Sequence, residues 1–368
     1  MSPALRSEQL HARVRAAMDA PLDLPLPSFD ALACDLARYQ AASCPAIARL
    51  FRARGVDPAT LRLASEIPAV PTEVFKMTRV AAHEPSQDAV VFRTSGTTAG
   101  ARGNHHLRST LTYRYGALRM GERMLIPDRP EGLRTLLLMS PTEEAPDSSL
   151  GFMAAAFAQA WADGGQWFLR GGSLDVAGLK QAVAEAREAR APVLLLATSF
   201  ALVYLLDALA GKALPLPPGS RVMQTGGYKG RSREVPADEL RVLAASTLAL
   251  DPRAVVSEYG MTELCSQAYE GTLRGLLGLD GATQEGVLAT PPWMQITPVD
   301  PDTLRPVPPG HEGIARITDL ANVDSAVVIQ TQDRIRQVEG GFVLLGRLSG
   351  APLRGCSLTV EEMLGGGP

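Results

Sequence analysis

The N-terminal part of the chain carries hydrophobic residues at helical spacing. Leu5, Leu10, Val14 and Met18 recur at intervals of four or five residues, as they would on one face of a helix. A second helical pattern, over residues 29–42, ends before Pro45, because proline lacks the amide hydrogen that a continuing helix needs. We therefore expect residues 1–88 to form a helical N-terminal cover.

From residue 89 onward the pattern changes to short apolar runs that alternate with helical stretches. The helical stretches include residues 150–163 and 174–190, and Ser199 is placed to cap a further apolar helix that Gly211 closes. The apolar runs cover residues 89–92, 136–139, 192–197, 221–224 and 254–256. Alternation of this kind predicts an α/β fold, with a mostly parallel sheet flanked by helices, over residues 89–284.

The last part of the chain is rich in valine, isoleucine and threonine and is divided by Pro-Gly and Gly-Gly turns. Runs such as GIARITDL and SAVVIQT fit short antiparallel strands. We expect a small β subdomain over residues 285–347 and a short C-terminal tail over residues 348–368.

Composition narrows the class of protein. The 368 residues carry a net charge of −3, and hydrophobic and charged residues make up 46% and 20% of the chain, as in ordinary globular proteins. The small net charge and the aromatic content of only 5% argue against a nucleic-acid partner. Four scattered cysteines do not form a disulfide framework, and no apolar run suits a signal peptide or a membrane span. We expect a soluble, cytoplasmic protein.

The strongest local motif is a loop rich in glycine and hydroxyl groups that follows the first short apolar run. It reads RTSGTTAGARG over residues 93–103. Glycine allows close backbone approach, hydroxyl groups can donate to phosphate oxygens, and Arg102 adds a fixed positive charge. The spacing differs from that of a P-loop ATPase and from the dinucleotide-binding fingerprint. A phosphate-binding loop is the functional interpretation, and a flexible turn without a ligand is the alternative.

Two further motifs stand at the ends of predicted strands. The sequence SEYGMTE over residues 257–263 suits an aromatic ring beside a base and an oxygen ligand for Mg²⁺. The sequence TQDR over residues 331–334 precedes a Gly-Gly turn, so that Asp333 could accept both ribose hydroxyls while Arg347 returns to the same ligand. Taken alone, the first motif also fits an ordinary strand-end loop, and the second also fits a salt-bridged hairpin.

Together and in this order, the three motifs resemble the adenylate-forming, or acyl-activating, superfamily. Its corresponding segments read TSGTTGxPK, YGxTE and TGDxxxxxxxGxxxxxGR. Within that superfamily the chain is most similar to the acyl-protein synthetase, or LuxE-like, family of fatty acid reductase complexes. Further matching stretches are IPAVP (67–71), VFK (74–76), residues 140–150, QTGGYKGR (224–231) and RGCS (354–357). The resemblance extends from about residue 65 to the C-terminus.

The resemblance implies an adenylate-forming N-terminal-domain-like body that lacks the superfamily's mobile C-terminal domain. It implies ATP and Mg²⁺ as cofactors, with Glu263 binding the metal and Asp333 and Arg347 holding the ribose. Arg102 or Lys229 would neutralise phosphate charge. The other residues expected to bind the nucleotide are Thr94, Ser95, Gly96, Thr97 and Thr98 at the β- and γ-phosphates, Gly226 and Gly227 along the adenine, Tyr259 stacked near it, and Gly260 and Thr262 in the same segment.

The chain also departs from the superfamily pattern. Ala99 and Gln332 replace residues that are usually glycine, and Arg102 replaces a usual lysine. Only 21 residues follow Arg347, whereas typical members continue into a mobile domain that supplies a catalytic lysine. The LuxE-like proteins share this shortness, and the catalytic lysine is therefore left unassigned.

Cys356 lies in a segment that resembles the one where LuxE-like proteins carry an acylated cysteine. A thiolate there could attack an acyl adenylate and form a thioester with AMP as the leaving group, and a packing cysteine in a turn is the alternative. Cys265 is the other candidate thiol, but its apolar setting indicates a core residue. His105 and His106 follow the phosphate loop and are interpreted as phosphate contacts or as the start of a helix.

The function we expect is ATP-dependent activation of a fatty or aryl carboxylic acid to an acyl adenylate, followed by transfer to a thiol. That thiol is Cys356, an acyl carrier protein, coenzyme A or a group on a reductase partner. The alternatives are an acyl- or aryl-CoA ligase and, from another class, a non-catalytic nucleotide-binding scaffold of a reductase complex.

Overall fold

A computed structural model describes residues 2–22, 24–94, 101–162, 164–226, 235–348 and 354–364, the last range with its first five residues as backbone only. The chain divides into two compact units. The first comprises residues 1–116, 261–266 and 290–368, and the second comprises residues 117–260 and 267–289. The motif over residues 257–263 therefore passes from the second unit into the first. Among the described residues, no helix has the length and apolar character needed to cross a membrane.

Helices open the first unit, in the region where we expected them. They are α1 (Pro3–Met18), α2 (Phe29–Ser43) and α3 (Pro45–Ala53), followed by the short 3-10 helices η1 (Pro58–Thr60) and η2 (Ala64–Glu66). Leu10, Val14 and Met18 of α1 are fully buried, whereas Leu5 is exposed and does not belong to the packed face. The helical spacing therefore identifies the buried side of α1 except in its first turn.

The sheet of the first unit is built mainly from antiparallel strands. Its order is β13 (Met294–Val299), β14 (Glu312–Asp319), β15 (Val328–Val338) and β16 (Gly341–Arg347). The short strand β1 (Val70–Pro71) pairs in parallel with β15, with Val70 opposite Ile329 and Pro71 opposite Gln330. The one-turn helix α4 (Val74–Met77) follows β1 after two residues, and the first of these, Thr72, donates from its amide to the Gln330 carbonyl of β15.

A separate antiparallel hairpin carries the predicted phosphate loop. Its strands are β2 (Val90–Arg93) and β3 (Asn104–Leu107), and the 3-10 helix η3 (Pro85–Gln87) precedes it. Our expectation that residues 89–92 belong to the parallel sheet was therefore wrong, because β2 pairs with β3 in a two-stranded sheet. His105 and His106 lie within β3 and do not begin a helix.

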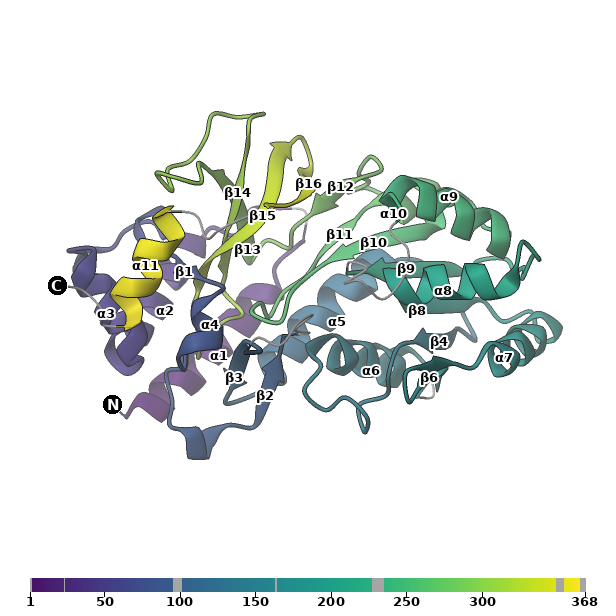
Figure 1. Ribbon diagram of the computed structural model, residues 1–368, viewed down its shortest axis with the longest axis horizontal. Coiled ribbons are helices and arrows are strands. Elements are labelled where there is room, and N and C mark those ends of the chain that lie inside the picture. The colour runs from purple at the N-terminus through teal and green to yellow at the C-terminus, as the bar shows by residue number, and fades with distance from the viewer. Residues whose placement is uncertain are drawn as a thin grey trace. The chain divides into compact units, whose positions relative to one another are not determined.

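The second unit is the α/β part of the molecule (Figure 1). Its strands run in the order β12 (Val287–Ala289), β11 (Ala268–Glu270), β10 (Val255–Tyr259), β9 (Arg221–Thr225), β8 (Val193–Thr198), β4 (Arg134–Leu138) and β5 (Gln166–Trp167). The strands from β10 to β5 are parallel, and β11 and β12 are antiparallel additions at one edge. The mostly parallel sheet predicted from the alternating pattern is thereby confirmed.

Helices cover this sheet. They are α5 (Leu111–Leu125), which runs from the first unit into the second, α6 (Ser149–Trp161), α7 (Val176–Glu188), α8 (Ser199–Leu209), α9 (Ala237–Leu248), α10 (Thr272–Leu276) and the 3-10 helix η4 (Pro252–Ala254), with a small hairpin of β6 (Leu169–Arg170) and β7 (Ser173–Leu174). Ser148 caps α6 by accepting from the Gly151 amide. The cap of α8 is Thr198 and not Ser199.

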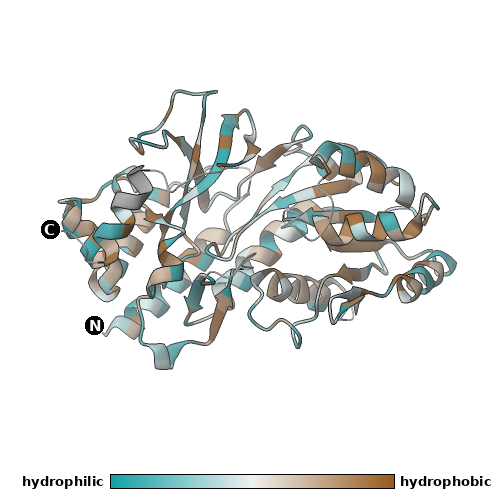
Figure 2. Ribbon diagram, in the orientation of Figure 1, coloured by the Kyte–Doolittle hydropathy of each residue, from teal (hydrophilic) through white to brown (hydrophobic). Residues whose placement is uncertain are grey.

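Both faces of the parallel sheet are buried. Leu136, Leu195 and Val222 share one core with residues of α7, α8 and α9. The intervening residues Leu137 and Leu196, which point to the opposite face, are equally buried. Helix α8, which packs on this sheet, is largely hydrophobic along its length (Figure 2). Burial on both faces explains why these strands are continuous apolar runs in the sequence.

The C-terminal part of the first unit ends in helix α11 (Arg354–Leu364), where we expected a turn and a tail. The Arg49 side chain donates to the Met363 carbonyl over 2.6 Å, and Arg54 forms an ion pair of 2.8 Å with Glu362. Both arginines belong to the α3 region, and Met363 is fully buried. The second half of α11 is therefore packed against α3 (Figure 1).

Candidate functional site

The base of the phosphate loop is closed by hydrogen bonds between its two ends. The Thr94 amide donates to the Gly103 carbonyl over 2.9 Å, and the Gly103 amide donates to the Thr94 hydroxyl over 2.8 Å. Arg102 donates from Nε to the Thr94 carbonyl over 2.6 Å and from a terminal nitrogen to the Arg93 carbonyl. Thr94 and Arg102, both predicted to contact phosphate, thus also hold the loop closed at its base. Residues 95–100, and with them Ser95, Gly96, Thr97 and Thr98, lie outside the described residues.

His105 joins the strand that leaves this loop to the predicted magnesium segment. Its Nδ1 lies 2.6 Å from the Thr262 carbonyl oxygen, although 157 positions separate the two residues. A carbonyl oxygen only accepts, so Nδ1 carries the proton and Nε2 is the unprotonated nitrogen of this tautomer. Burial lowers the pKa of His105 to about 4, which keeps the ring neutral near pH 7. The structure therefore brings together two motifs that the sequence keeps far apart.

Two polar side chains, one at the end of β14 and one in the connection that follows it, hold the rest of the predicted magnesium segment. The Asn322 amide donates to the Glu263 carbonyl over 2.9 Å. Asp319 accepts from the Cys265 amide over 2.8 Å and from the Ser266 hydroxyl over 2.6 Å. Both of these side chains are buried. The backbone from Thr262 to Ser266 is thus held on several sides within the first unit.

The Glu263 carboxyl is buried and lies among several charges. Burial raises its pKa to about 7; of the neighbouring charges, Arg347 and Lys76 lower this pKa and Glu73 raises it. In the described residues, no cluster of three histidine, cysteine or acidic side chains could hold a metal ion with protein ligands alone. Mg²⁺ often binds through one or two carboxylates together with substrate phosphates and water, and a single buried glutamate fits that mode.

The two residues predicted to hold the ribose face each other across a strand pair. Asp333 of β15 is directly opposite Arg347 of β16, and the Arg347 Nε lies 3.9 Å from the Asp333 carboxylate. Asp333 is largely buried, whereas the Arg347 side chain is 61% exposed. This register brings the Asp333 carboxylate and the Arg347 guanidinium to the same side of the hairpin. The positive charge of Arg347 also lowers the pKa of Glu263.

The second unit carries the residues predicted for the adenine. Gly226 follows β9 with φ of +73°, a left-handed conformation that favours glycine, and its carbonyl accepts from the Ser199 hydroxyl over 2.8 Å. Tyr259 ends β10, where its side chain is largely buried, and Gly260 follows it. Glu258 accepts a hydrogen bond from the Thr225 hydroxyl, and burial raises the pKa of Glu258 to about 7. Gly227 and Lys229 lie outside the described residues.

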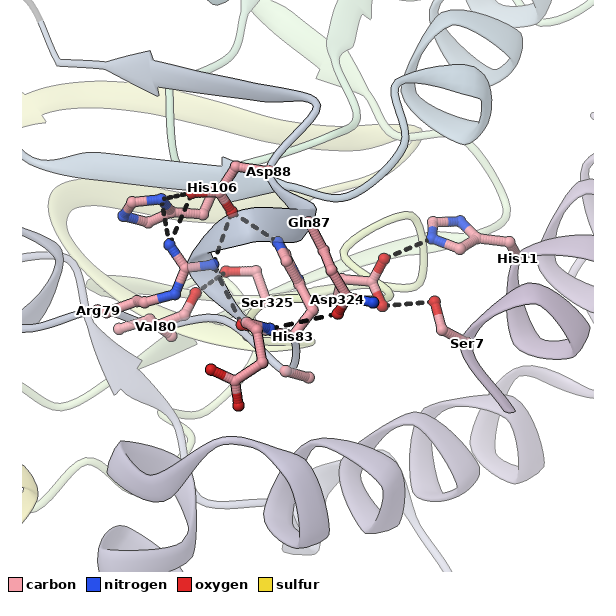
Figure 3. Close-up of polar contacts among 12 residues, drawn as sticks. Ser7, His11, Arg79, Val80, His83, Gln87, Asp88, His106, Asp324 and Ser325 are labelled. Carbon is pink, nitrogen blue, oxygen red and sulfur yellow. Dashed lines mark hydrogen bonds and ion pairs between the residues drawn. The ribbon is translucent and has the colours of Figure 1, made fainter. Parts of the chain in front are cut away.

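A charged cluster supports the foot of the β2–β3 hairpin (Figure 3). Asp88, just before β2, accepts from Arg79 over 2.6 and 2.8 Å and from His83 over 2.8 Å, and His106 of β3 lies 2.9 Å from it. Burial opposes ionisation of Asp88, but these hydrogen bonds together hold its pKa well below the usual range. The cluster thus ties both strands of the hairpin to the segment that follows α4.

The described thiols are buried. Cys34, Cys44 and Cys265 are free cysteines, and burial raises the pKa of each. This agrees with our interpretation of Cys265 as a core residue. The backbone of Cys356 lies in the first turn of α11 and not in a turn between strands, and its side chain is outside the described part of the structure.

Sequence reasoning missed the residues that hold these motifs in place. Asp319 and Asn322 carry no motif, and only their burial and partners reveal them. His105 was noticed as a neighbour of the loop, but its link to Thr262 depends on the tertiary fold. Lys76 belongs to a matching stretch, and its proximity to Glu263 has no sequence signal of its own.

The fold is that of the adenylate-forming ligases. The structure of a 2-hydroxyisobutyryl-CoA ligase in its postadenylation state, in complex with an adenylate, matches with a TM-score of 0.65 and 15% identity over 88% of this chain and 69% of that chain. ATP-bound MatB from Rhodopseudomonas palustris matches with a TM-score of 0.52 and 18% identity over 72% of this chain and 49% of that chain. At such identities the likeness defines the fold alone.

The sequence assigns the chain more narrowly. It matches the family described as acyl-protein synthetase, LuxE, over residues 37–365, and the chain belongs to this family. A long-chain-fatty-acid–luciferin-component ligase from Vibrio harveyi is 24% identical over 150 residues. That alignment covers 38% of this chain and 36% of the relative, so the matched part spans little more than a third of the relative's length.

Proposed function

We propose that this protein activates a carboxylic acid with ATP, forming an acyl adenylate and pyrophosphate, and then passes the acyl group to a thiol. Family membership supports this reaction class, and so does the fold shared with adenylate-forming ligases. The observation that carries the proposal is the 2.6 Å contact between His105 and Thr262. It joins the phosphate-loop hairpin to the segment of Glu263 within one unit, as a site for a metal-bound triphosphate requires.

The first step needs positioning and charge neutralisation more than covalent chemistry by the protein. A carboxylate oxygen attacks the α-phosphorus, and the bond to the bridging oxygen of pyrophosphate breaks. In our proposal, Asp333 and Arg347 orient the ribose. The phosphate loop, with Thr94 at its base, holds the β- and γ-phosphates. Gly226, Tyr259 and Gly260 of the second unit are proposed for the adenine, and Gly227 and Lys229 stay predictions for the same nucleotide.

Mg²⁺ fits this proposal through Glu263. The metal would supply charge neutralisation on the phosphate oxygens when bound. Glu263 must lose its proton to act as a ligand; burial opposes this by raising its pKa to about 7, whereas the positive charges of Arg347 and Lys76 lower that pKa and favour release of the proton. His105, Asn322 and Asp319 would keep the backbone of the segment in place while the carboxylate binds.

The second step in this proposal uses a thiol that attacks the acyl adenylate carbonyl and releases AMP. Cys356 is one candidate acceptor, since it belongs to the matching stretch RGCS and lies in the first turn of α11. Coenzyme A, an acyl carrier protein and a partner enzyme are the other candidates. Fatty and aryl acids are both considered as substrates.

Exchange of labelled pyrophosphate into ATP, measured with a panel of fatty and aryl acids, tests the first step. We expect exchange with at least one acid, and a Kd for ATP that rises about tenfold or more in Asp333→Asn, which loses a charged acceptor. Asp302→Asn, on an exposed loop of the same unit, is the matched control and should leave both values unchanged. Binding of ATP without exchange for any acid would favour the nucleotide-binding scaffold instead.

Intact-mass analysis after incubation with ATP and the productive acid tests the second step. An acyl adduct that is absent in Cys356→Ala and present in Cys34→Ala would assign Cys356 as the acceptor. An adduct that persists in Cys356→Ala contradicts that assignment. Product that forms only after coenzyme A is added would instead favour an acyl-CoA ligase.

A further inference from the structure

The proposed adenylation site needs positive charge that is available to the nucleotide phosphates. Phosphoryl-transfer sites stabilise the developing charge with positioned cations. In the first unit, Arg102 and Arg347 are two cations at the predicted motifs. Arg102 donates to the carbonyls of Arg93 and Thr94 at the base of the loop, and Arg347 lies 3.9 Å from Asp333. Both arginines therefore also have structural contacts to maintain.

Lys76 is a third cation of this region. It lies on α4 with an exposed side chain, and no hydrogen bond or ion pair joins its ammonium to another residue in the described ranges. The ammonium is nevertheless near enough to the buried Glu263 carboxyl to interact with it electrostatically, as Arg347 does. Lys76 thus contributes positive charge to the electrostatic surroundings of the proposed magnesium ligand.

The residue before Lys76 contacts the base of the phosphate loop. The Cβ of Phe75 lies 3.5 Å from the position that a Cβ on Gly103 would occupy. The Phe75 ring also meets the His105 ring edge-on, with centroids 5.9 Å apart and an angle of 86° between the planes. Phe75 is fully buried, so this packing holds α4 against the hairpin that carries the loop.

The strand before α4 fixes the helix relative to the ribose segment. Pro71 is paired with Gln330 of β15, and the Thr72 amide donates to the Gln330 carbonyl over 3.0 Å. Asp333 lies three residues further along the same strand. The chain around Lys76 is therefore tied to the hairpin that carries the phosphate loop and to the strand that carries Asp333.

The basic composition of the chain makes this lysine distinctive. Of its 36 basic residues only four are lysines, at positions 76, 180, 212 and 229, and the other 32 are arginines. Lys76 and Lys229 both fall in stretches that match the family pattern. A lysine ammonium is a compact point charge on a flexible stem, which can follow a phosphate oxygen as the geometry of the phosphorus changes.

We propose that Lys76 is a catalytic cation of the adenylation step, with its ammonium contacting an oxygen of the α-phosphate. This inference rests on the proposed function. The new bond joins the acid's carboxylate oxygen to the α-phosphorus, and the breaking bond releases its electron pair to pyrophosphate. Lys76 stays protonated throughout and takes no part in proton transfer, and it offsets the negative charge that develops around the phosphorus.

The test compares Lys76→Ala with two controls in pyrophosphate exchange and in nucleotide binding by calorimetry. Met77→Ala changes an exposed, uncharged side chain of the same helix, and Lys180→Ala removes an exposed lysine from α7 of the second unit. We expect Lys76→Ala to slow exchange about 10²- to 10³-fold, the range found when one donor to a developing charge is removed. We also expect a weaker affinity for ATP with no change in the affinity for adenosine, while both controls stay within threefold of the wild type.

Lys76→Arg separates charge from shape. It should restore the affinity for ATP and restore exchange only in part, because the planar guanidinium is larger than an ammonium. Circular dichroism spectra equal to that of the wild type are expected for each variant, since the Lys76 side chain is exposed. An equal loss of exchange in Met77→Ala would show that the helix and not the ammonium matters, and it would overturn the inference.

The failure of this inference differs from the failure of the proposed function. If the wild type catalyses exchange, and Lys76→Ala has the same exchange rate and the same affinity for ATP as the wild type, the role of Lys76 is overturned. The proposed function then stays intact. Absence of exchange in the wild type with every acid overturns the proposed function. In that case an unchanged ATP affinity in Lys76→Ala also overturns phosphate binding by Lys76, and a loss specific to ATP supports it.

Discussion

The neutral ring of His105 carries one N–H, and the hydrogen-bond partners around the ring determine which nitrogen bears it. The Thr262 carbonyl takes the Nδ1–H, and Nε2 has no hydrogen-bond partner among the described residues. Because burial lowers the pKa of His105 to about 4, the ring stays neutral and this donor role is constant across the physiological range. We therefore regard His105 as a positioning residue for the Thr262–Glu263 backbone.

Substitutions that keep or remove the donor at Nδ1 test this role. In His105→Asn the amide nitrogen takes the place of Nδ1, whereas His105→Leu leaves the buried Thr262 carbonyl without a donor. We expect His105→Leu to lose about 1–3 kcal/mol of stability, as for other buried groups left unsatisfied. We also expect it to lose most of its pyrophosphate exchange, and His105→Asn should retain the larger part of both.

The exposed His311 provides the control. His311→Leu should change neither urea denaturation nor exchange, since this ring lies at the surface. Equal behaviour of His105→Leu and His105→Asn would mean that ring packing against Phe75, and not the hydrogen bond to Thr262, is the contribution of His105.

At the scale of elements, a buried ion pair connects helix α9 to the sheet of the second unit. Arg241 of α9 donates to both carboxylate oxygens of Glu270 on β11, and both side chains are at least 95% buried. Glu270 also accepts from the Ser257 amide over 2.8 Å and from the Gly286 amide over 2.6 Å. The pair therefore satisfies backbone groups of β10 and of the turn before β12, so that no charge is left unpaired.

Removal of one partner should be costly for this reason. We expect Arg241→Ala to lower the free energy of unfolding by about 3–5 kcal/mol, because it leaves the Glu270 carboxylate buried and unpaired. The exposed pair Arg253–Asp251 of the same unit is the comparison, and Arg253→Ala should cost less than about 1 kcal/mol. Urea denaturation of both variants measures the difference, and equal costs would contradict the argument from burial.

The hairpin β2–β3 illustrates a second property of elements. Its strands have four residues each, and a two-stranded ribbon of this size is marginal in isolation. The charged cluster around Asp88 and the packing of Phe75 against His105 supply the tertiary contacts that stabilise this hairpin. The loop between these strands is therefore presented on a base that the rest of the first unit stabilises.

At the scale of the whole molecule, protonation of a buried acid is linked to folding. Burial raises the pKa of Glu258 from 4.5 to about 7, so the folded second unit holds a proton that the unfolded chain releases between these values. The contribution of Glu258 to stability is therefore fully present below about pH 4.5 and is lost as the pH rises through about 7. The shift corresponds to about 3 kcal/mol.

A pH series of urea denaturation on Glu258→Gln measures this contribution. The amide stays neutral and can still accept from Thr225, so the variant should resemble the wild type at pH 5. By pH 8 it should be more stable than the wild type by up to about 3 kcal/mol. Glu239→Gln, on the exposed face of α9, is the control. A constant difference between Glu258→Gln and the wild type at all pH values would contradict the linkage.

The arrangement of the elements explains which predictions from the sequence succeeded. The helices α6, α7 and α8 and the strands β4, β8, β9 and β10 fall where periodicity placed them, because each depends on local pattern and on burial of a continuous face. The run at residues 89–92 was assigned to the wrong sheet, since an apolar run of this length carries no information about its partner strand. Strand β1 has only two residues, too few for any periodicity.

The sequence by itself determined the family and supplied the motifs of the proposed nucleotide site, because motif residues are read in order along the chain and need no knowledge of contacts. Only the tertiary structure decided how they are held. It placed His105 against Thr262, Asp333 opposite Arg347 and Lys76 near Glu263. The physical reason is that hydrogen bonds and charges act over a few ångströms in space, whereas His105 and Thr262, for example, lie 157 positions apart along the chain.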